Sequence, residues 1–137
     1  MIINYILYIL TLAIFIYVLN RYFSGAKFNG HKPNLWGYVA VITGGNTGIG
    51  KETAIILAEQ GCKVIIGARD TEKSAKLVKE INSKLGKDIA EQYYLDLGDL
   101  KSIRDFVGNI TAEKIDFLVN NAGVMALPKR TLTKSGF

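Results

Sequence analysis

Four glycines fall within the nine residues Ile42–Gly50, which read ITGGNTGIG. Glycine inside a helix or strand costs roughly 0.5–1 kcal/mol relative to alanine, so such a cluster needs a structural reason. An apolar run precedes the segment at residues 38–42, and a stretch with helical periodicity follows it. We therefore predict a turn at which the backbone closely approaches a ligand, with a flexible loop as the alternative.

Short apolar runs and helical stretches alternate along the chain after residue 35. A helical stretch separates each predicted strand from the next, and strands connected in this way form a parallel sheet with right-handed crossovers. We predict the α/β class, namely the N-terminal half of a Rossmann-type doubly wound sheet with strand order 3-2-1-4. The strands are expected at residues 38–42, 63–66, 92–95 and 115–119.

Each of the three helical stretches is predicted to bury one face against this sheet. Gly61 and Gly86 would end the first two helices, and Asp70 or Thr71 would cap the second. The residues assigned to the buried faces are Ile49, Thr53, Ile56, Leu57 and Gln60 in the first helix, Ala75, Val78, Ile81 and Leu85 in the second, and Leu100, Ile103, Val107 and Ile110 in the third.

A different environment is predicted for the amino terminus. The segment Ile2–Leu19 has no charged residue, and its only non-aromatic polar residues are Asn4 and Thr11. Its length approaches the roughly 30 Å hydrocarbon core of a bilayer. We predict a transmembrane signal-anchor helix at residues 1–20, which contacts the lipid bilayer through residues 2–19.

A linker is predicted at residues 21–34 and a partial Rossmann domain, with four strands and three helices, at 35–137. A cleaved signal peptide is the alternative, because Ser24–Ala26 offers small residues, although no basic region precedes the apolar run. Positive charge stays on the cytosolic side of a membrane, which predicts a single-pass protein whose domain faces the cytosol. The positive residues that follow the apolar segment are Arg21, Lys27 and Lys32.

The membrane itself is expected to be that of the endoplasmic reticulum, with a mitochondrial membrane or a lipid droplet as alternatives. The sequon Asn109–Thr111 would matter only in a lumenal domain, so we expect it to stay unglycosylated.

Composition argues against two other classes of function. The net charge of +5 is modest, and no basic stripe is interleaved with aromatic residues, so nucleic acid is not an expected partner. Cys62 and His31 are the only residues of their kinds. We expect Cys62 to be a small buried residue, and we expect no metal site.

The position of the glycine cluster explains its composition. It follows the first predicted strand and opens the first predicted helix, whose free N–H groups and positive dipole end can receive a pyrophosphate. In this interpretation Gly44 allows the tight turn, Gly48 lets the backbone approach the phosphates, and Gly50 lets helix and strand pack closely.

Three motifs resemble those of the short-chain dehydrogenase/reductase family. The TGxxxGxG turn is met by Thr43, Gly44, Gly48 and Gly50, an acidic residue after the third strand by Asp96, and NNAG after the fourth strand by residues 120–123. The resemblance covers residues 35–137. Together with the apolar anchor, NTGIG, GARD and NNAGVM look most like the membrane-associated retinol dehydrogenase-like reductases.

The resemblance implies that this chain binds a nicotinamide dinucleotide, with the acidic residue near the adenine. The residues expected to bind it are Thr43, Gly44, Asn46, Thr47, Gly48, Ile49, Gly50, Arg69, Asp96, Leu97, Asn120, Ala122 and Gly123.

The end of the second strand bears on the choice of cofactor. Ala68 stands where the family places an acidic residue when it uses NAD, and Arg69 follows with a side chain suited to a phosphate. Asp70 is the competing candidate for a ribose contact, but a helix cap is a simpler role for it. We therefore expect NADP(H) to be favoured over NAD(H).

Catalytic residues of the family are not found in this chain. The family uses a tyrosine and a lysine in the pattern YxxxK, and none of the seven tyrosines has a lysine four positions later. We expect the parent reaction to be hydride transfer between NADP(H) and an alcohol or carbonyl compound, of lipophilic, retinoid-like or steroid-like character. This chain would then hold the cofactor-binding half alone.

The alternative is a non-catalytic, membrane-anchored structural or NADP-binding subunit of a larger complex. Ending the chain at Phe137 would leave the fourth strand as an open sheet edge, which is a hazard for aggregation. In either case we expect a protein partner, or a further part of the protein, to cover that edge.

Overall fold

The computed structural model describes residues 2–24, 30, 32–125, 128–134 and 136, which fall into two compact units, Met1–His31 and Lys32–Phe137. The first unit is the helix α1 (Ile2–Phe23), which continues for three residues beyond residue 20. Of the predicted linker, residues 25–29 and 31 lie outside the described residues, and with them Lys27, His31 and part of the small-residue segment Ser24–Ala26.

Helix α1 is long and apolar enough to cross a membrane, and it is the only described helix that is. The candidate span is Ile3–Phe23, with a mean hydropathy of 1.9, and its most apolar stretch is not buried within the protein. At 1.5 Å per residue, a helix of this length extends for about 30 Å, the thickness of a hydrocarbon core.

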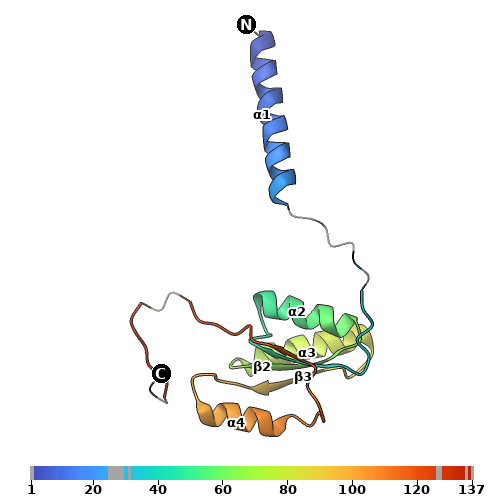
Figure 1. Cartoon of the computed structure of the whole chain (residues 1–137), viewed down its shortest axis with the longest axis vertical. Helices are drawn as coiled ribbons and strands as arrows, with labels where there is room; N and C mark the ends of the chain where they lie inside the picture. The colour runs from blue at the N-terminus through green and yellow to red at the C-terminus, as the bar shows by residue number, and fades with distance from the viewer. Residues whose placement is uncertain (1, 25–29, 31, 126–127, 135, 137) are drawn as a thin grey trace. The chain divides into compact units, whose positions relative to one another are not determined.

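The second unit is built on a parallel sheet of four strands in the order β3-β2-β1-β4. This confirms the predicted 3-2-1-4 order. Helices α2 (Gly48–Glu59) and α3 (Thr71–Leu85) cover one face of the sheet, and α4 (Leu100–Asn109) covers the other (Figure 1). The strands are β1 (Val39–Thr43), β2 (Lys63–Ala68), β3 (Ala90–Tyr94) and β4 (Phe117–Val119).

The core forms two layers because alternate residues of a strand point to opposite faces. Ile42 and Ile66, which are paired in register, lie in the layer between the sheet and helices α2 and α3. Their neighbours Val41 and Ile65 pack with Phe106 on the α4 side. Strand β2 is therefore buried on both faces, as expected for the inside of a doubly wound sheet.

The predicted buried face of α2 is wrong at Ile49 and Ile56, although Leu57 packs against the core as predicted. The residues of α2 that are buried are Gly50, Ala54 and Ala58, whereas Ile49 and Ile56 are 82% and 51% exposed. Small residues on the inner side allow the helix to lie close to the sheet, so the larger residues point to its flanks.

The predicted faces of α3 and α4 are confirmed in part, since Ile81 is buried and Val78, Leu85, Ile103 and Ile110 pack against the core, but they differ at other positions. Ser74 and Ser102 are buried, whereas Ala75 and Val107 are exposed. The hydroxyl of Ser74 donates to the Asp70 carbonyl at 2.8 Å, and that of Ser102 accepts from the Asp96 N–H at 2.9 Å. Because each serine has a backbone partner, burial leaves no polar group unpaired.

Both predicted end signals of α3 are confirmed. The Asp70 carboxylate caps the helix by accepting from the Lys73 N–H at 3.0 Å. Gly86 ends it with a φ of +64°, a conformation that favours glycine.

Candidate functional site

The carboxyl ends of β1, β2 and β4 meet at one edge of the sheet, and the glycine turn lies there. The Gly44 N–H donates to the Gly67 carbonyl at 2.7 Å, which extends the β1–β2 pairing into the turn. Gly44 has a φ of +65°, and a Cβ atom at this position would lie 2.9 Å from the Ala122 Cα. Only glycine therefore fits both the turn and the approach of the loop after β4.

Thr43 and Asn121 join the glycine turn to the loop that follows β4. The Thr43 hydroxyl accepts from the N–H groups of Asn121 at 3.1 Å and Ala122 at 3.0 Å. In the other direction, the Asn121 amide donates to the carbonyls of Thr43 at 3.0 Å and Gly44 at 3.1 Å. The two loops therefore form one hydrogen-bonded unit, although they are far apart in the sequence.

Asn121 is not among the residues that the sequence predicts to bind the cofactor. A detectable signal was present, since short polar side chains follow two strands that the predicted order places side by side, at Thr43 and at Asn120–Asn121. Thr43, by contrast, is predicted to bind the cofactor, and in the structure it is almost completely buried. The side chain of Asn120 is exposed.

The amino terminus of α2 opens directly from the turn. Thr47 occupies the N-cap position without a side-chain hydrogen bond to the helix, and the first turn has no acidic residue. Gly48 has a φ of +54°, and no atom lies within 4 Å of where its Cβ would be. Thr47, Gly48 and Ile49 are exposed, so the positive end of the helix dipole faces open space.

Gly50 has a different role from Gly48. A Cβ at Gly50 would lie 2.6 Å from the Gly44 carbonyl oxygen and would also collide with the Asn121 amide. The absence of a side chain at Gly50 therefore allows the helix to sit against the turn. The glycines combine an open surface at Gly48 with tight packing beneath it.

The end of β2 places two charged groups beside the turn. Ala68 is buried, and the exposed Arg69 has no hydrogen bond or ion pair within the described part of the chain. Asp70 is engaged instead: it caps α3, and its carboxylate lies 3.0 Å from the Lys73 Nζ. Hydrogen bonds from the Lys73 N–H and then from its side chain lower the pKa of Asp70.

Asn46 connects this region to the turn, since its amide donates to the Asp70 carbonyl at 3.4 Å. One guanidinium near the turn is therefore unengaged, while the neighbouring carboxylate is already committed to its own helix.

Asp96 and Leu97 lie at the end of β3, separated from β1 by β2. The Asp96 carboxylate accepts from the Gly98 N–H at 2.9 Å, which closes a tight local turn. Asp99 caps α4 and lies 2.8 Å from the Lys134 Nζ. The hydrogen bond from Lys134 is the main cause of the lowered pKa of Asp99. Leu97 is exposed beside this ordered loop.

Two further features bear on other kinds of site. Among the described residues, no group of three or more His, Cys, Asp or Glu side chains could hold a metal ion. Cys62 is buried, as predicted, and its thiol donates to the Tyr38 carbonyl at 3.3 Å. Burial raises the pKa of this thiol, which keeps it protonated.

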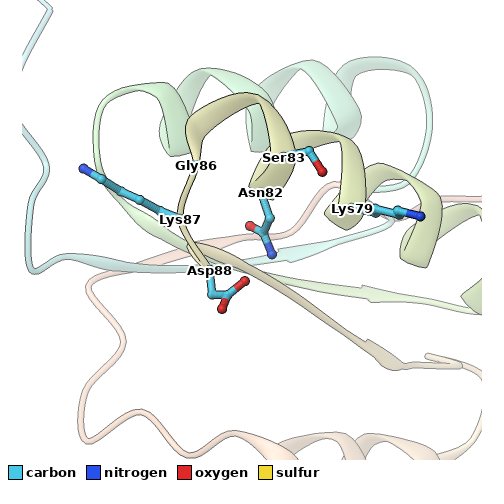
Figure 2. Close-up of a pocket in the computed structure, with 6 residues that line it drawn as sticks. All are labelled: Lys79, Asn82, Ser83, Gly86, Lys87 and Asp88. Atoms are coloured by element: carbon cyan, nitrogen blue, oxygen red, sulfur yellow. The ribbon is translucent and has the colours of Figure 1, made fainter.

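A surface hollow of about 410 Å³ lies at the carboxyl end of α3 (Figure 2). Its central side chain, Asn82, makes three hydrogen bonds to the backbone of Ile89 and Ala90, at 2.9–3.1 Å. Lys79 and Lys87 extend in opposite directions from the hollow (Figure 2). It therefore brings no group of polar side chains to one point, unlike the edge at the glycine turn.

A parallel sheet with a glycine turn between its first strand and first helix defines a nucleotide-binding α/β domain of the doubly wound class. The chain belongs to the short chain dehydrogenase family, whose profile matches residues 38–135. It is 43% identical over 108 residues to retinol dehydrogenase 13 of Homo sapiens, a match that covers 77% of this chain and 32% of that protein.

A match to retinol dehydrogenase 12 of Bos taurus, 41% identical over 129 residues, covers 90% of this chain and 40% of the relative. The unit Lys32–Phe137 makes up less than 90% of the chain. The match therefore also includes residues of the first unit. The chain thus spans about a third of the length of the curated relatives it matches.

Solved structures agree with this assignment. L-sorbose reductase from Gluconobacter frateurii, solved with NADPH and L-sorbose, has 27% sequence identity and a TM-score of 0.64. The match covers 69% of this chain and 36% of the reductase.

Proposed function

We propose that this chain is the cofactor-binding part of a membrane-anchored oxidoreductase that transfers a hydride between NADP(H) and an alcohol or carbonyl compound. The observation that carries the proposal is the open amino terminus of α2, which follows a glycine turn that Asn121 bonds to the loop after β4, in a chain of the short chain dehydrogenase family. When bound, the nicotinamide ring supplies the hydride or accepts it.

The residues at the turn fit the charge and shape of a dinucleotide. The pyrophosphate would lie over Gly48, where no side chain is in the way, and would accept hydrogen bonds from the first N–H groups of α2. Asn46, Thr47 and Ile49 would line the same approach. Asp96 and Leu97 would contact the adenine, and the loop with Asn120, Ala122 and Gly123 would lie along the ribose side.

The preference for NADP(H) rests on the end of β2. Arg69 is exposed and free of ion pairs among the described residues, so its guanidinium is available to a ribose 2′-phosphate. The Asp70 carboxylate would repel that phosphate, but its charge is offset by the Lys73 N–H and ammonium. Both features favour the phosphorylated cofactor.

The lipophilic, retinoid-like or steroid-like substrate is proposed from the apolar helix α1 and from the names of the relatives. We further propose that the domain faces the cytosol, most simply at the endoplasmic reticulum. The exposed sequon at Asn109 tests this orientation in cells. A mass shift on glycosidase treatment of the expressed full chain would contradict it.

No catalytic residue is assigned to this chain, and the rest of the active site is proposed to come from outside residues 1–137. A second candidate is a non-catalytic NADP-binding subunit with a partner protein on the β4 side. The observation that favours it is the exposed apolar surface there, which includes Leu118 and, just before β4, Ile115. Copurification of the full chain with a stable partner would support this candidate.

Calorimetry on the full chain in detergent micelles tests cofactor binding, with NADPH and NADH compared. Arg69→Ala should raise the Kd for NADPH about tenfold, the value of one charge-assisted contact, and leave the Kd for NADH nearly unchanged. The matched control is Arg104→Ala, since Arg104 is an exposed arginine on α4. Equal weakening of both cofactors would contradict the NADP preference, and a folded chain that binds neither would contradict the proposed function.

A further inference from the structure

The opposite edge of the sheet, at the amino ends of the strands, carries a fixed and exposed tryptophan. Trp36 is the only tryptophan in the chain, and 59% of its surface is exposed. Its ring lies against Gly61, where a Cβ would be 2.8 Å from the Trp36 Cδ1. The Leu35 N–H donates to the Gln60 carbonyl at 2.8 Å, which fixes the backbone beside the ring.

A pair of aromatic rings lies at the same edge. Tyr38 stacks on Phe117 of β4, with ring centroids 5.8 Å apart, and both rings are partly exposed. A lysine accompanies each group: the Lys87 Nζ lies 4.1 Å from the Trp36 centroid, and the Lys114 Nζ lies 5.4 Å from that of Tyr38. We call these five residues the aromatic edge.

The aromatic edge adjoins a groove of about 380 Å³, which Trp36 and Lys87 help to line. The apolar residues Ala58, Leu85 and Ile89 line it as well, together with polar residues such as Lys32. Figure 2 shows Lys87 extending away from the end of α3. Several of the other charges at this edge are already paired, among them Lys84 with Glu59 and Lys63 with Glu91.

This combination suits the headgroup layer of a bilayer. Tryptophan and tyrosine favour that layer because their rings are apolar and their N–H and O–H groups are polar. Lysine beside them can bury its methylene chain and keep its ammonium in water. Because ion pairs balance much of the charge at the edge, the aromatic rings supply the attraction, and an anionic lipid is not required.

The covalent connection to the anchor makes even a weak contact effective. Helix α1 ends at Phe23, and Leu35 is already hydrogen-bonded into the second unit, so only residues 24–34 connect the two. Such a segment spans at most about 40 Å when fully extended. A tether of this length keeps the local concentration of membrane surface high, so the edge need not bind a bilayer strongly by itself.

We propose that the aromatic edge rests in the headgroup layer of the bilayer in which α1 is anchored. The inference rests on the membrane anchor included in the proposed function. It places the glycine turn, at the opposite edge of the sheet, on the side of the domain that faces away from the lipid.

The single tryptophan provides a direct test. The full chain is reconstituted in phosphatidylcholine vesicles that contain phospholipids brominated either near the headgroup or deep in the acyl chain. Shallow bromines should lower Trp36 emission roughly twofold relative to unbrominated vesicles, and deep bromines should lower it less, as expected for a ring at headgroup level. Emission unaffected by shallow bromines would overturn the proposal.

A matched control separates docking from simple tethering. The double variant Trp36→Phe/Val107→Trp carries its only tryptophan at an exposed position on α4, with the anchor and linker unchanged. Its emission should be nearly insensitive to both brominated lipids. Equal quenching of the two proteins would overturn docking through the aromatic edge, because tethering alone would then explain the effect.

Flotation of the same vesicles keeps the two proposals distinguishable. Failure of the wild-type chain to float with lipid contradicts the anchor, and with it the docking. A chain that floats but shows no quenching of Trp36 contradicts the docking alone. The comparison of shallow and deep bromines uses only the wild-type chain, so an absence of shallow quenching overturns the docking even if the double variant does not fold.

Discussion

Strands β2 and β4 both belong to the parallel sheet, but they are stabilised in different ways. All residues of β2 except the first are buried, and it pairs with a strand on each side. Strand β4 pairs with β1 alone, and Leu118 at its centre is 62% exposed. The centre of the sheet therefore depends on apolar burial, whereas the β4 edge must depend on something else.

Side-chain hydrogen bonds at both ends hold β4 in place. At the amino end, the Asp116 carboxylate accepts from the Val39 N–H at 2.8 Å, and the Asp116 N–H donates to the Val39 carbonyl at 2.9 Å. At the carboxyl end, Thr43 and Asn121 make the bonds described above. An edge held in this way should respond to polar substitutions and to pH, while the centre should not.

The largest expected effect is at the centre. Ile66→Ala removes a side chain with no exposed surface and should lower the free energy of unfolding by about 2–5 kcal/mol, through lost burial and the cavity left behind. Leu118→Ala should cost about 0.5 kcal/mol or less. Urea unfolding of the full chain in detergent measures both. Similar costs for the two variants would mean that β4 is as well covered as β2.

A smaller effect is expected at the carboxyl end of β4. Asn121→Ala leaves the carbonyls of Thr43 and Gly44 without their partner and should cost about 1–3 kcal/mol. The matched control is Asn120→Ala, since the Asn120 side chain is exposed. Amide hydrogen exchange should become faster at Leu118 and Val119 in the Asn121 variant, before it does so in β2. Unchanged exchange in β4 would show that the hydrogen bonds of the Asn121 side chain do not hold the edge strand in place.

The smallest effect concerns pH at the amino end of β4. The Val39 N–H, and secondarily Lys114, lower the pKa of Asp116 below its ordinary value of 3.8. A group whose pKa is lower in the folded state stabilises the fold fully above its unfolded pKa, and this contribution is lost as the pH falls through the folded value.

The difference in unfolding midpoint between wild type and Asp116→Asn should therefore be constant near neutral pH and shrink below about pH 4. Denaturant titrations at pH 7, 5 and 3 measure it. Glu113→Gln, at an exposed carboxylate on the same connection, should leave the pH dependence unchanged. A difference that grows as the pH falls would contradict the assignment.

The strand order could be predicted from the sequence because it depends only on the alternation of strands and helices, not on individual side chains. Four apolar runs separated by helical stretches allow few connections, and the glycine turn identifies the first crossover. The buried faces of the helices were harder to predict. In α2 the apolar residues surround most of the helix, so periodicity favoured Ile49 and Ile56, while close packing on the sheet required Gly50 and Ala54.

The site was predictable where it depends on backbone conformation. The turn at Gly44 and the close approach at Gly50 each require a glycine, and these glycines are visible directly in the sequence. The hydrogen bonds of the Asn121 side chain could not be predicted, because they depend on a contact between loops that only the assembled sheet brings together. The buried serines Ser74 and Ser102 were missed for a similar reason, since their partners are backbone groups rather than apolar side chains.

The bond between Asn121 and Gly44 also has a consequence for the chain as it is made on the ribosome. The two residues are 77 positions apart, so at typical synthesis rates of 5–20 residues per second Asn121 is added on the order of 4–15 seconds after the glycine turn. Until then, the carbonyls of Thr43 and Gly44 lack the Asn121 amide as a partner. Synonymous codons that slow translation between residues 44 and 121 would lengthen the interval during which this turn is exposed to misfolding and to chaperones.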